Sequence, residues 1–353
     1  MADATVSVQQ LSEFCTRALR QLGADENDAQ VTSDALVMTD TWGVFTHGTK
    51  LLHDYLLRIQ AGGTRVDCKP ELEREGPAWA VVEGHSVMGQ VAGKFAMDTA
   101  LAKARKCGVA YVGVKHTNHF GAAGYYASIA AQNGMIGLSM ANDIPSVVAP
   151  GARTAVTGSN PLSYAVPTGN GNEPIMLDMA ISSVAGGKVY AACQRGEPIP
   201  DTWIVGPDGL PTTDGQLYPA QAALQPAGGA KGYGLALLVE TLSGVLSGAS
   251  ITWQIGNWIW GDKDQPTNHG AAFLAVDVNA VMPAEEFYQR VDHLVSEIHN
   301  TPTVAGVDRV MLPGEREWRH RQKSLEHGLH LPEDVLAKLR GVAEMVGEKP
   351  DWL

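Results

Sequence analysis

Two histidines, His116 and His119, lie in the segment HTNHFG at residues 116–121. The segment follows an apolar run, Val109 to Val114, that predicts a buried strand, and precedes a pattern typical of a helix at 122–133. Histidine at a strand end suits proton transfer, because its ring titrates near neutrality and the strand holds it rigidly. Three roles are open for the pair: acid–base catalysis by at least one ring, structural roles, or metal binding.

Three further segments carry polar or glycine-rich patterns at expected element boundaries. The motif Thr46-His47-Gly48 stands at a helix start, where the partial positive charge favours an anion. Asp178 ends a predicted strand and suits an imidazole or a ribose hydroxyl. Lys231 lies among the glycines of residues 228–234, which suit a pyrophosphate resting on backbone N–H groups. Each pattern also has a structural interpretation, namely an N-cap, an acid in a first helical turn, and a plain loop.

Three common catalytic motifs are missing from the sequence. No GxGxxG follows a strand, so a Rossmann site is not supported. Residues 182–188 resemble the end of a P-loop, but Ser182 stands at the first glycine position and Val189 replaces Ser or Thr. GxSxG and HExxH are also absent. The usual nucleotide-hydrolase, serine-hydrolase and zincin interpretations are therefore removed.

Hydrophobic periodicity predicts helices and strands in mixed order. The predicted helices are 8–22, 25–40, 49–61, 93–107, 122–133, 182–195, 233–246, 284–299 and one opening at Pro332. The predicted strands are 79–83, 109–114, 135–140, 163–167, 175–179, 203–205 and 272–278. This order favours an α/β protein with a mixed central sheet covered by helices, since a strict βαβ repeat is missing.

Composition narrows the function classes. The chain has 353 residues, 44% of them apolar and 18% charged, as in a globular protein of more than one core. Its formal net charge of −12 argues against nucleic-acid binding. No leader or membrane-spanning window is evident, so a cytoplasmic location without membrane partners is expected. The four cysteines form no CxxC pair, and Cys15 and Cys107 are expected to be buried thiols.

Taken in order, several motifs resemble those of the malate/L-lactate dehydrogenase family often called type 2. The matching segments are 46–48, 118–121, 158–161, 177–180, 187–188, 199–203, 231–234 and 312–315. The family is unrelated to Rossmann-fold lactate and malate dehydrogenases, which accounts for the missing GxGxxG. It includes ureidoglycolate, sulfolactate and diketogulonate oxidoreductases and cyclic-imine reductases.

The resemblance implies hydride transfer between NAD or NADP and a small 2-hydroxy acid, 2-oxo acid or related substrate. By position, His119 matches the family's proton donor or acceptor, and Thr46 with His47 matches its substrate-contacting pair. His116 has no clear counterpart. The implied cofactor contacts are Asp143, Asp178, Met179, Ala180, Lys188, Lys231, Gly232, Pro313, Gly314 and Glu315.

The resemblance also implies a non-Rossmann cofactor domain and a second, mainly helical domain formed by both chain ends. Residues 1–70 are expected to form the N-terminal part of a substrate and dimerisation domain, residues 71–280 the mixed-sheet cofactor domain, and residues 281–353 a helical part returning to the first. Subunits are expected to pair as a homodimer or a dimer of dimers, with sites near the interface.

One position departs from the family pattern. The family usually has Ser-His-Gly-x-x-Arg, whose arginine is the expected clamp for a substrate carboxylate. Here Leu51 takes that place, and the adjacent Lys50 should point elsewhere, about a hundred degrees around the helix. Arg58, two turns on, is the candidate substitute. The substrate is therefore expected to lack the usual α-carboxylate or to hold it differently.

Two rival hypotheses remain. The chain could be a nucleotide-binding family member without dehydrogenase activity. It could instead be a metal-dependent hydrolase or lyase built on His116 and His119, with His85 or Asp178 as third ligand. The dehydrogenase interpretation expects no metal. The tryptophans at 253, 258 and 260 could line an enlarged apolar pocket, but such a cluster is more often a core or a subunit contact.

Overall fold

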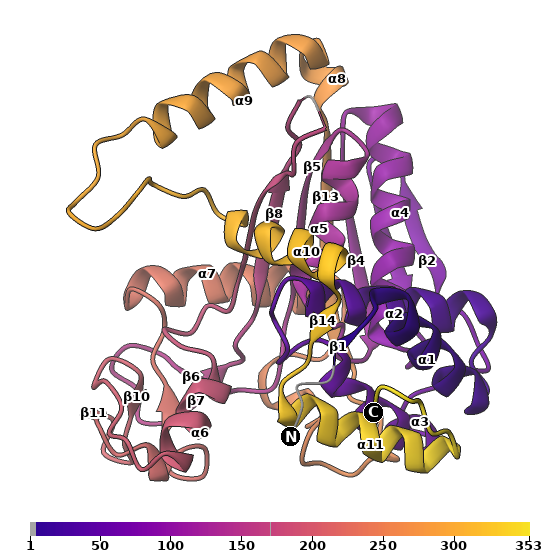
Figure 1. Cartoon of the computed structure of the whole chain (residues 1–353), viewed down its shortest axis with the longest axis vertical. Helices are drawn as coiled ribbons and strands as arrows, with labels where there is room; N and C mark the ends of the chain where they lie inside the picture. The colour runs from indigo at the N-terminus through magenta and orange to yellow at the C-terminus, as the bar shows by residue number, and fades with distance from the viewer. Residues whose placement is uncertain (1–4, 170) are drawn as a thin grey trace.

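A computed structural model describes residues 5–169 and 171–353, and its centre is a seven-stranded mixed sheet (Figure 1). The strands, in spatial order, are β2 (Glu71–Gly76), β3 (Trp79–Glu83), β4 (Val109–Thr117), β13 (His269–Asp277), β5 (Met135–Ala141), β8 (Leu162–Val166) and β9 (Ile175–Met179). β3 and β4 run parallel, and the other neighbours run antiparallel. The predicted α/β class with a mixed central sheet is confirmed.

Helices cover both faces of this sheet, and its strands send alternate side chains to two cores. On one face Phe273 packs in the main core with α4 (Gly89–Cys107) and α5 (Ala123–Gln132). On the other face Leu274 packs beside Val239 of α7 (Ala230–Glu240), which continues into the π-helical turn η3 (Thr241–Val245). The sheet is therefore a rigid middle layer that can present side chains at its ends.

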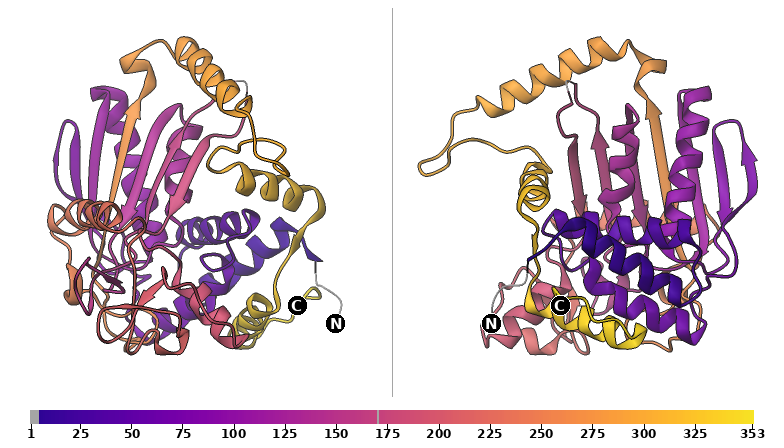
Figure 2. Two further views of the ribbon diagram at one scale, coloured as in Figure 1. Left: turned by 90° about the vertical axis from the view of Figure 1, so that its left-hand side faces the viewer. Right: turned by 45° about the vertical axis from the view of Figure 1, so that its right-hand side comes forward.

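The two ends of the chain meet in a helical layer beside one end of the sheet (Figures 1 and 2). Its elements are β1 (Thr5–Val6), α1 (Val8–Gln21), α2 (Glu26–Thr41), η1 (Thr49–Leu51), α3 (Leu52–Ala61), α10 (Glu315–His327), β14 (Leu329–His330) and α11 (Glu333–Val346). β1 pairs with β14, α10 packs on α2, and α11 packs on α1 and α3. The predicted helical part built from both chain ends is thus present, whereas its boundaries at 70 and 281 stay a proposal.

A second, smaller sheet lies apart from the large one, with α6 (Gly186–Gln194) against it (Figure 1). Its strands, in spatial order, are β11 (Pro211–Thr212), β10 (Ile204–Val205), β12 (Ala223–Leu224), β6 (Val147–Val148) and β7 (Ala155–Thr157), with η2 (Gly215–Leu217) nearby. Val147, Val189 and Leu224 belong to its separate core. All five strands have two or three residues, too few for a measurable alternation, and the sequence predicted only β10, within 203–205.

Beyond β13 the chain forms an arm that projects from the body (Figures 1 and 2). The arm contains α8 (Val278–Val281), α9 (Ala284–His299) and the loop of residues 300–314, which leads into α10. η4 (Thr252–Gln254) lies earlier, in the loop before β13. Within residues 5–169 and 171–353, no helix combines the length and apolarity needed to cross a membrane. The cellular location stays a prediction.

Several predicted elements differ from the observed ones. The strands at 79–83 and 175–179 and the helix at 284–299 are confirmed at both ends. The helix predicted from residue 182 begins only at Gly186, and the one predicted over 233–246 begins at Ala230. α10 was not predicted, because Glu315–His327 is highly charged and buries few side chains. Tertiary packing rather than a strong apolar stripe holds it.

The cysteines are free thiols, and one prediction about them was wrong. Cys15 is buried as expected. Cys107 is exposed because it is the last residue of α4, where the helix leaves the sheet.

Candidate active site

His119 lies two residues beyond the end of β4, half-buried among rings from three other segments. Its imidazole stacks on Trp258, with ring centroids 4.0 Å apart and planes 15° from parallel. The ring of His47, from the segment between α2 and η1, lies 5.8 Å away, and that of Tyr55, from α3, lies 6.1 Å away. The structure therefore brings together two predicted residues and two aromatic residues without an assigned role.

Hydrogen bonds fix one nitrogen of His119 and leave the other free. The Tyr55 hydroxyl lies 2.7 Å from Nδ1, and the Gly121 N–H points to the same atom at 3.4 Å. Among the described residues, no group bonds Nε2. Burial, together with the nearby His47, lowers the pKa of His119 to about 3, so the ring is neutral near pH 7. Nε2 of a neutral ring is thus the atom available to a substrate.

His47 is placed by a buried carboxylate beneath its loop. The Thr46 hydroxyl lies 3.0 Å from its Nδ1, and burial lowers the pKa of its ring. Asp40 accepts hydrogen bonds from the backbone N–H and the hydroxyl of Thr49, at 3.1 and 2.5 Å. A Cβ on Gly48 would lie 1.8 Å from an Asp40 oxygen, so only glycine fits there. Asp40 and Gly48 together set where the Thr46–His47 pair lies.

Asp40 should make stability depend on pH. Its side chain is fully buried, and desolvation raises its pKa from 3.8 to about 7 despite the Thr49 hydrogen bonds. Between these values the folded protein holds a proton that the unfolded chain has lost, so stability falls as pH rises from about 4 to about 7. Asp40→Asn should flatten that part of the profile. Urea unfolding of both proteins across this range provides the measurement, and parallel curves would contradict the assignment.

Asp143 and His269 form a buried pair beside the two site histidines. His269 Nε2 lies 3.1 Å from Asp143 Oδ1, and its Nδ1 lies 2.9 Å from the Thr267 hydroxyl. Burial acts to raise the pKa of Asp143, but the hydrogen bond and charge of His269, with a contribution from His119, hold it below its usual value. Asp143 is therefore an anion that favours positive charge nearby. Sequence reasoning missed His269, although it lies three residues before the strand predicted at 272–278, with Gly270 beside it.

The predicted cofactor residues of segments 178–180 and 313–315 gather around β9. Asp178 accepts the backbone N–H of Gly124, at the start of α5, at 2.7 Å. Desolvation raises the pKa of Asp178 to about 6, against the lowering effect of this hydrogen bond. Pro313 accepts a hydrogen bond from the N–H of Met176 on β9 at 3.1 Å, and Gly314 passes so close that a Cβ would lie 2.8 Å from the Met176 carbonyl oxygen. The structure thus brings the turn at 313–315 to the strand that carries Asp178, Met179 and the following Ala180.

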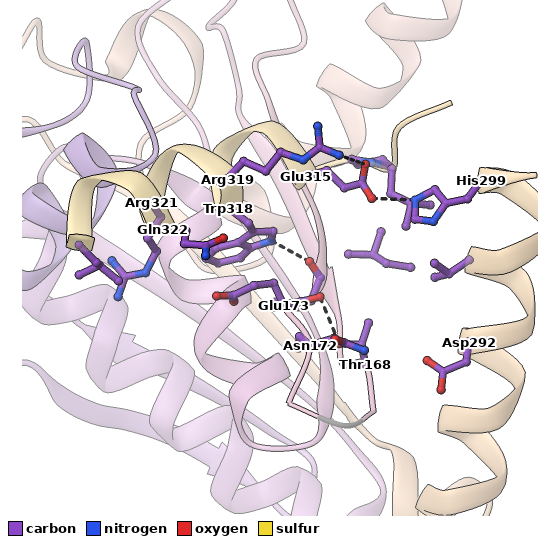
Figure 3. A pocket seen from close by; sticks show the side chains of 16 residues that line it. Thr168, Asn172, Glu173, Asp292, His299, Glu315, Trp318, Arg319, Arg321 and Gln322 are labelled. Atoms are coloured by element: carbon purple, nitrogen blue, oxygen red, sulfur yellow. Dashed lines mark hydrogen bonds and ion pairs between the residues drawn. The ribbon is translucent and has the colours of Figure 1, made fainter. Parts of the chain in front are cut away.

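A cavity of about 470 Å³ opens beside this turn, between α9, α10 and the loop after β8. Figure 3 shows Glu315 of α10 pointing to His299 of α9, and the two side chains bond at 2.7 Å. Glu315 also accepts from Arg309 at 2.8 Å. Its carboxylate is therefore held by side chains of the projecting arm and does not stand free in the cavity.

The two predicted lysines lie on the helices nearest the small sheet. Lys188 is in the first turn of α6, Lys231 is in the first turn of α7, and both are exposed. Neither makes an ion pair within residues 5–169 and 171–353. A Cβ on Gly232 would lie 2.1 Å from the Ala227 carbonyl oxygen, so glycine is required where α7 begins. A Cβ placed on Gly187 would lie 3.9 Å from the methyl carbon of Thr46. α6 therefore adjoins the His47 loop.

The position of the family's arginine holds the uncharged Leu51, and the proposed substitute, Arg58, is engaged elsewhere. The Arg58 guanidinium is only 2% exposed and donates to the backbone carbonyls of Asp262 at 3.3 Å and of Gln265. These carbonyls belong to the loop that carries Trp258. Leu51 packs against the main core at the start of α3. The geometry favours a loop-anchoring role for Arg58 over the predicted substrate contact.

His116 lies on the strand rather than in the loop after it, and its side chain turns to a different neighbourhood. Its Nδ1 bonds Glu83 of β3 at 2.8 Å, while His85 bonds Glu71 at 3.0 Å. In the part of the chain that the structure describes, no three His, Cys, Asp or Glu side chains are grouped for a metal ion. The metal-dependent hypothesis thus finds no donor set among these residues.

The three tryptophans do not form one cluster. Trp258 is buried against His119, whereas Trp253 and Trp260 are more than half exposed. Trp260 lies 6.5 Å, between ring centroids, from Tyr190 of α6. The loop of residues 256–266 therefore lines the site with Trp258 and reaches toward the small sheet with Trp260.

A neutral histidine beside an anionic Asp143, at the end of a mixed sheet without a Rossmann turn, defines an α/β protein equipped for acid–base chemistry. Residues 6–340 match the family described as malate/L-lactate dehydrogenase. This chain belongs to the malate/L-lactate dehydrogenase family, which confirms the resemblance seen in its motifs.

Named relatives cover nearly the whole chain. It is 36% identical to malate dehydrogenase of Pyrococcus abyssi, over 96% of this chain and 94% of the relative. It is 34% identical to ureidoglycolate dehydrogenase (NAD(+)) of Escherichia coli K12, over 94% and 93%. The crystal structure of Δ1-piperideine-2-carboxylate reductase from Pseudomonas syringae superposes with a TM-score of 0.86 at 30% identity, over 96% of this chain and 99% of that one.

Proposed function

We propose that this protein is an NAD- or NADP-dependent oxidoreductase that transfers a hydride between the nicotinamide and a small 2-hydroxy acid, 2-oxo acid or related substrate. The observation that carries the proposal is the neutral His119, with its free Nε2, in a chain of this family. Its relatives include enzymes named for malate, ureidoglycolate and a cyclic imine acid.

The residues around β9 fit a dinucleotide. Gly232 leaves no room for a side chain at the start of α7, where backbone N–H groups can meet phosphate oxygens. Lys188 and Lys231 are exposed cations without ion pairs among the described residues, which suits a pyrophosphate. Asp178 is a candidate ribose acceptor. The bound nicotinamide would supply the hydride chemistry at C4.

In oxidation the neutral His119 ring with an unprotonated Nε2 would take the hydroxyl proton and become the imidazolium, and in reduction the imidazolium would donate that Nε2 proton to the substrate oxygen and become neutral again. His47, whose Nδ1 already faces the Thr46 hydroxyl, would help to bind that oxygen. Trp258 would exclude water from one face of the His119 ring. Asp143 would favour the transient positive charge on the imidazole.

The reaction class can be tested directly by a screen with both cofactors. The purified protein would be offered 2-oxo acids, 2-hydroxy acids, sulfonates and cyclic imines while NAD(P)H absorbance is followed. Turnover of at least one class is the expected result. A protein that binds NADH but turns over none of them would favour the rival without dehydrogenase activity.

We further propose that the substrate is atypical, because Leu51 stands where the family's arginine would be. Leu51 is one turn before Tyr55 on α3, so position 51 faces the same side as the residue that contacts His119. Leu51→Arg should raise kcat/KM for malate about 10- to 100-fold, through charge-assisted hydrogen bonds of roughly 1.5–3 kcal/mol. Leu51→Lys is the matched control and should gain less, since a lysine cannot bind bidentately. Efficient turnover of malate by the wild-type protein would oppose this proposal.

A homodimer is the remaining part of the proposal. Large apolar side chains are exposed along α7, η3 and the following residue: Leu235, Leu237, Leu238, Val245 and Leu246. Such a surface suits a subunit contact. Light scattering after size exclusion should give at least twice the monomer mass of 37.5 kDa.

A further inference from the structure

Two groups, the Gly121 N–H and the Tyr55 hydroxyl, lie within hydrogen-bond distance of His119 Nδ1. The backbone N–H of Gly121 can only donate, and it points at Nδ1 from 3.4 Å. The Tyr55 hydroxyl lies closer to the same atom, at 2.7 Å. A ring nitrogen can accept a hydrogen bond from such a donor only when its lone pair is free, that is, when the nitrogen carries no proton. Nδ1 is therefore in surroundings that favour its unprotonated form.

Gln90 orients the hydroxyl group of Tyr55 by a hydrogen bond. The Gln90 side-chain amide donates to the Tyr55 oxygen at 3.2 Å. Gln90 is 1% exposed and Tyr55 is 6% exposed, so bulk water does not compete with these bonds. Because the Tyr55 oxygen already accepts from Gln90, its single O–H is free to donate to Nδ1. The chain thus runs from Gln90 to Tyr55 to His119.

We propose that Tyr55 is a positioning residue that holds neutral His119 in the tautomer with its proton on Nε2. The resting site then presents an N–H donor to the substrate oxygen. Burial keeps the ring uncharged near neutral pH, so the choice between two neutral tautomers is a real one. Trp258 stacking keeps the ring from turning over.

The tautomer discriminates between the two partners of the proposed reaction, and this consequence rests on the proposed function. A carbonyl oxygen only accepts, so an oxo substrate needs the Nε2–H donor. A hydroxy substrate can bind this tautomer only as an acceptor, so oxidation must begin from the other neutral tautomer, with the proton on Nδ1. In reduction Nδ1 must gain a proton from solvent before Nε2 gives one to the substrate oxygen, so that the ring ends neutral. By holding this tautomer, Tyr55 makes the site prefer the oxo form of the substrate over the hydroxy form.

Nitrogen NMR of the whole protein, labelled at its histidines, tests the tautomer without any substrate. His119→Gln identifies the His119 signals. The wild-type protein should show a protonated Nε2 and a bare Nδ1, and Tyr55→Phe should shift His119 to a mixture of tautomers. Tyr111→Phe is the matched control: it removes a buried hydroxyl that bonds the Leu242 carbonyl at 2.7 Å, and it should leave His119 unchanged. A wild-type ring with its proton on Nδ1 would overturn the proposal, as would a Tyr55→Phe protein with an unaltered tautomer.

Kinetics provide the second readout, once a substrate pair is known. Because the equilibrium constant is fixed, Tyr55→Phe must lower kcat/KM by the same factor in both directions, and the split between kcat and KM is informative. Because only the Nε2–H fraction of a tautomer mixture binds the oxo substrate, its KM should rise by the inverse of that fraction, about 2-fold for an equal mixture, with little change in the KM for the hydroxy substrate. Equal changes in both KM values would contradict the binding preference. The expected tautomer in a protein that turns over nothing would leave the tautomer standing and refute only the proposed reaction.

If Tyr55→Phe does not fold, Gln90→Leu serves in its place. It keeps the phenol but removes the donor that orients it, so the Tyr55 hydroxyl can rotate and the tautomer mixture should again appear. A His119 signal identical to that of the wild-type protein in this variant would oppose the role given to Gln90.

Discussion

His119→Ala should lower kcat by about 10²- to 10⁴-fold, the range for losing a general acid–base group. The ring contacts Tyr55 and Trp258, whereas the candidate cofactor residues lie around β9 and the starts of α6 and α7. Binding of NADH should therefore change little. Steady-state rates, combined with fluorescence titration of NADH, separate the two effects.

The matched control is His116→Ala, on β4 three residues before His119. That side chain is directed to Glu83 and is partly exposed, so its loss should leave turnover close to wild type. Near-normal turnover in His119→Ala would refute the assignment. A large loss in both variants would instead indicate damage to the end of β4.

Arg58→Ala should reduce the free energy of unfolding by about 2–5 kcal/mol, through lost charge-assisted hydrogen bonds and a cavity. The guanidinium is buried, bonds two carbonyls of the 256–266 loop, and has an Nε without a partner among the described residues. Lys263 also bonds the Trp258 carbonyl within this loop, at 3.2 Å. Without Arg58 the loop should loosen, and kcat should fall because Trp258 no longer holds the His119 ring.

Urea unfolding and tryptophan fluorescence measure this effect. Arg65→Ala is the control, because Arg65 lies just beyond α3, is exposed and pairs only with Asp67 among the described residues. Its stability should stay near that of the wild-type protein. A higher substrate KM without lost stability in Arg58→Ala would restore the substrate contact that the sequence suggested.

Local patterns predicted what depends on neighbours along the chain. The apolar run before His119 predicted a strand over 109–114, and β4 begins at Val109 and runs on to Thr117. A helix was predicted over 25–40, and Asp25 caps it, because its carboxylate accepts the Asp28 N–H at 2.9 Å. These features need only a few adjacent residues to form.

Contacts between residues far apart in the chain could not be predicted from the sequence. Tyr55 and Gln90 carry no signal in the sequence, because their roles arise only where α3 and α4 meet the end of β4. The spacing from position 51 placed Arg58 two turns further along the same face of the helix. It could not tell whether a substrate or the loop of residues 256–266 would occupy that face, and the structure places the guanidinium on the loop.

The pairing of β1 with β14 has a consequence for how the protein is made. Thr5 is synthesised 325 residues before its partner, His330. α1 and α2 must therefore wait, with apolar faces uncovered, while the large sheet assembles. The helical layer is then completed only after the large sheet, because α10 and α11 are needed to cover α2 and α1.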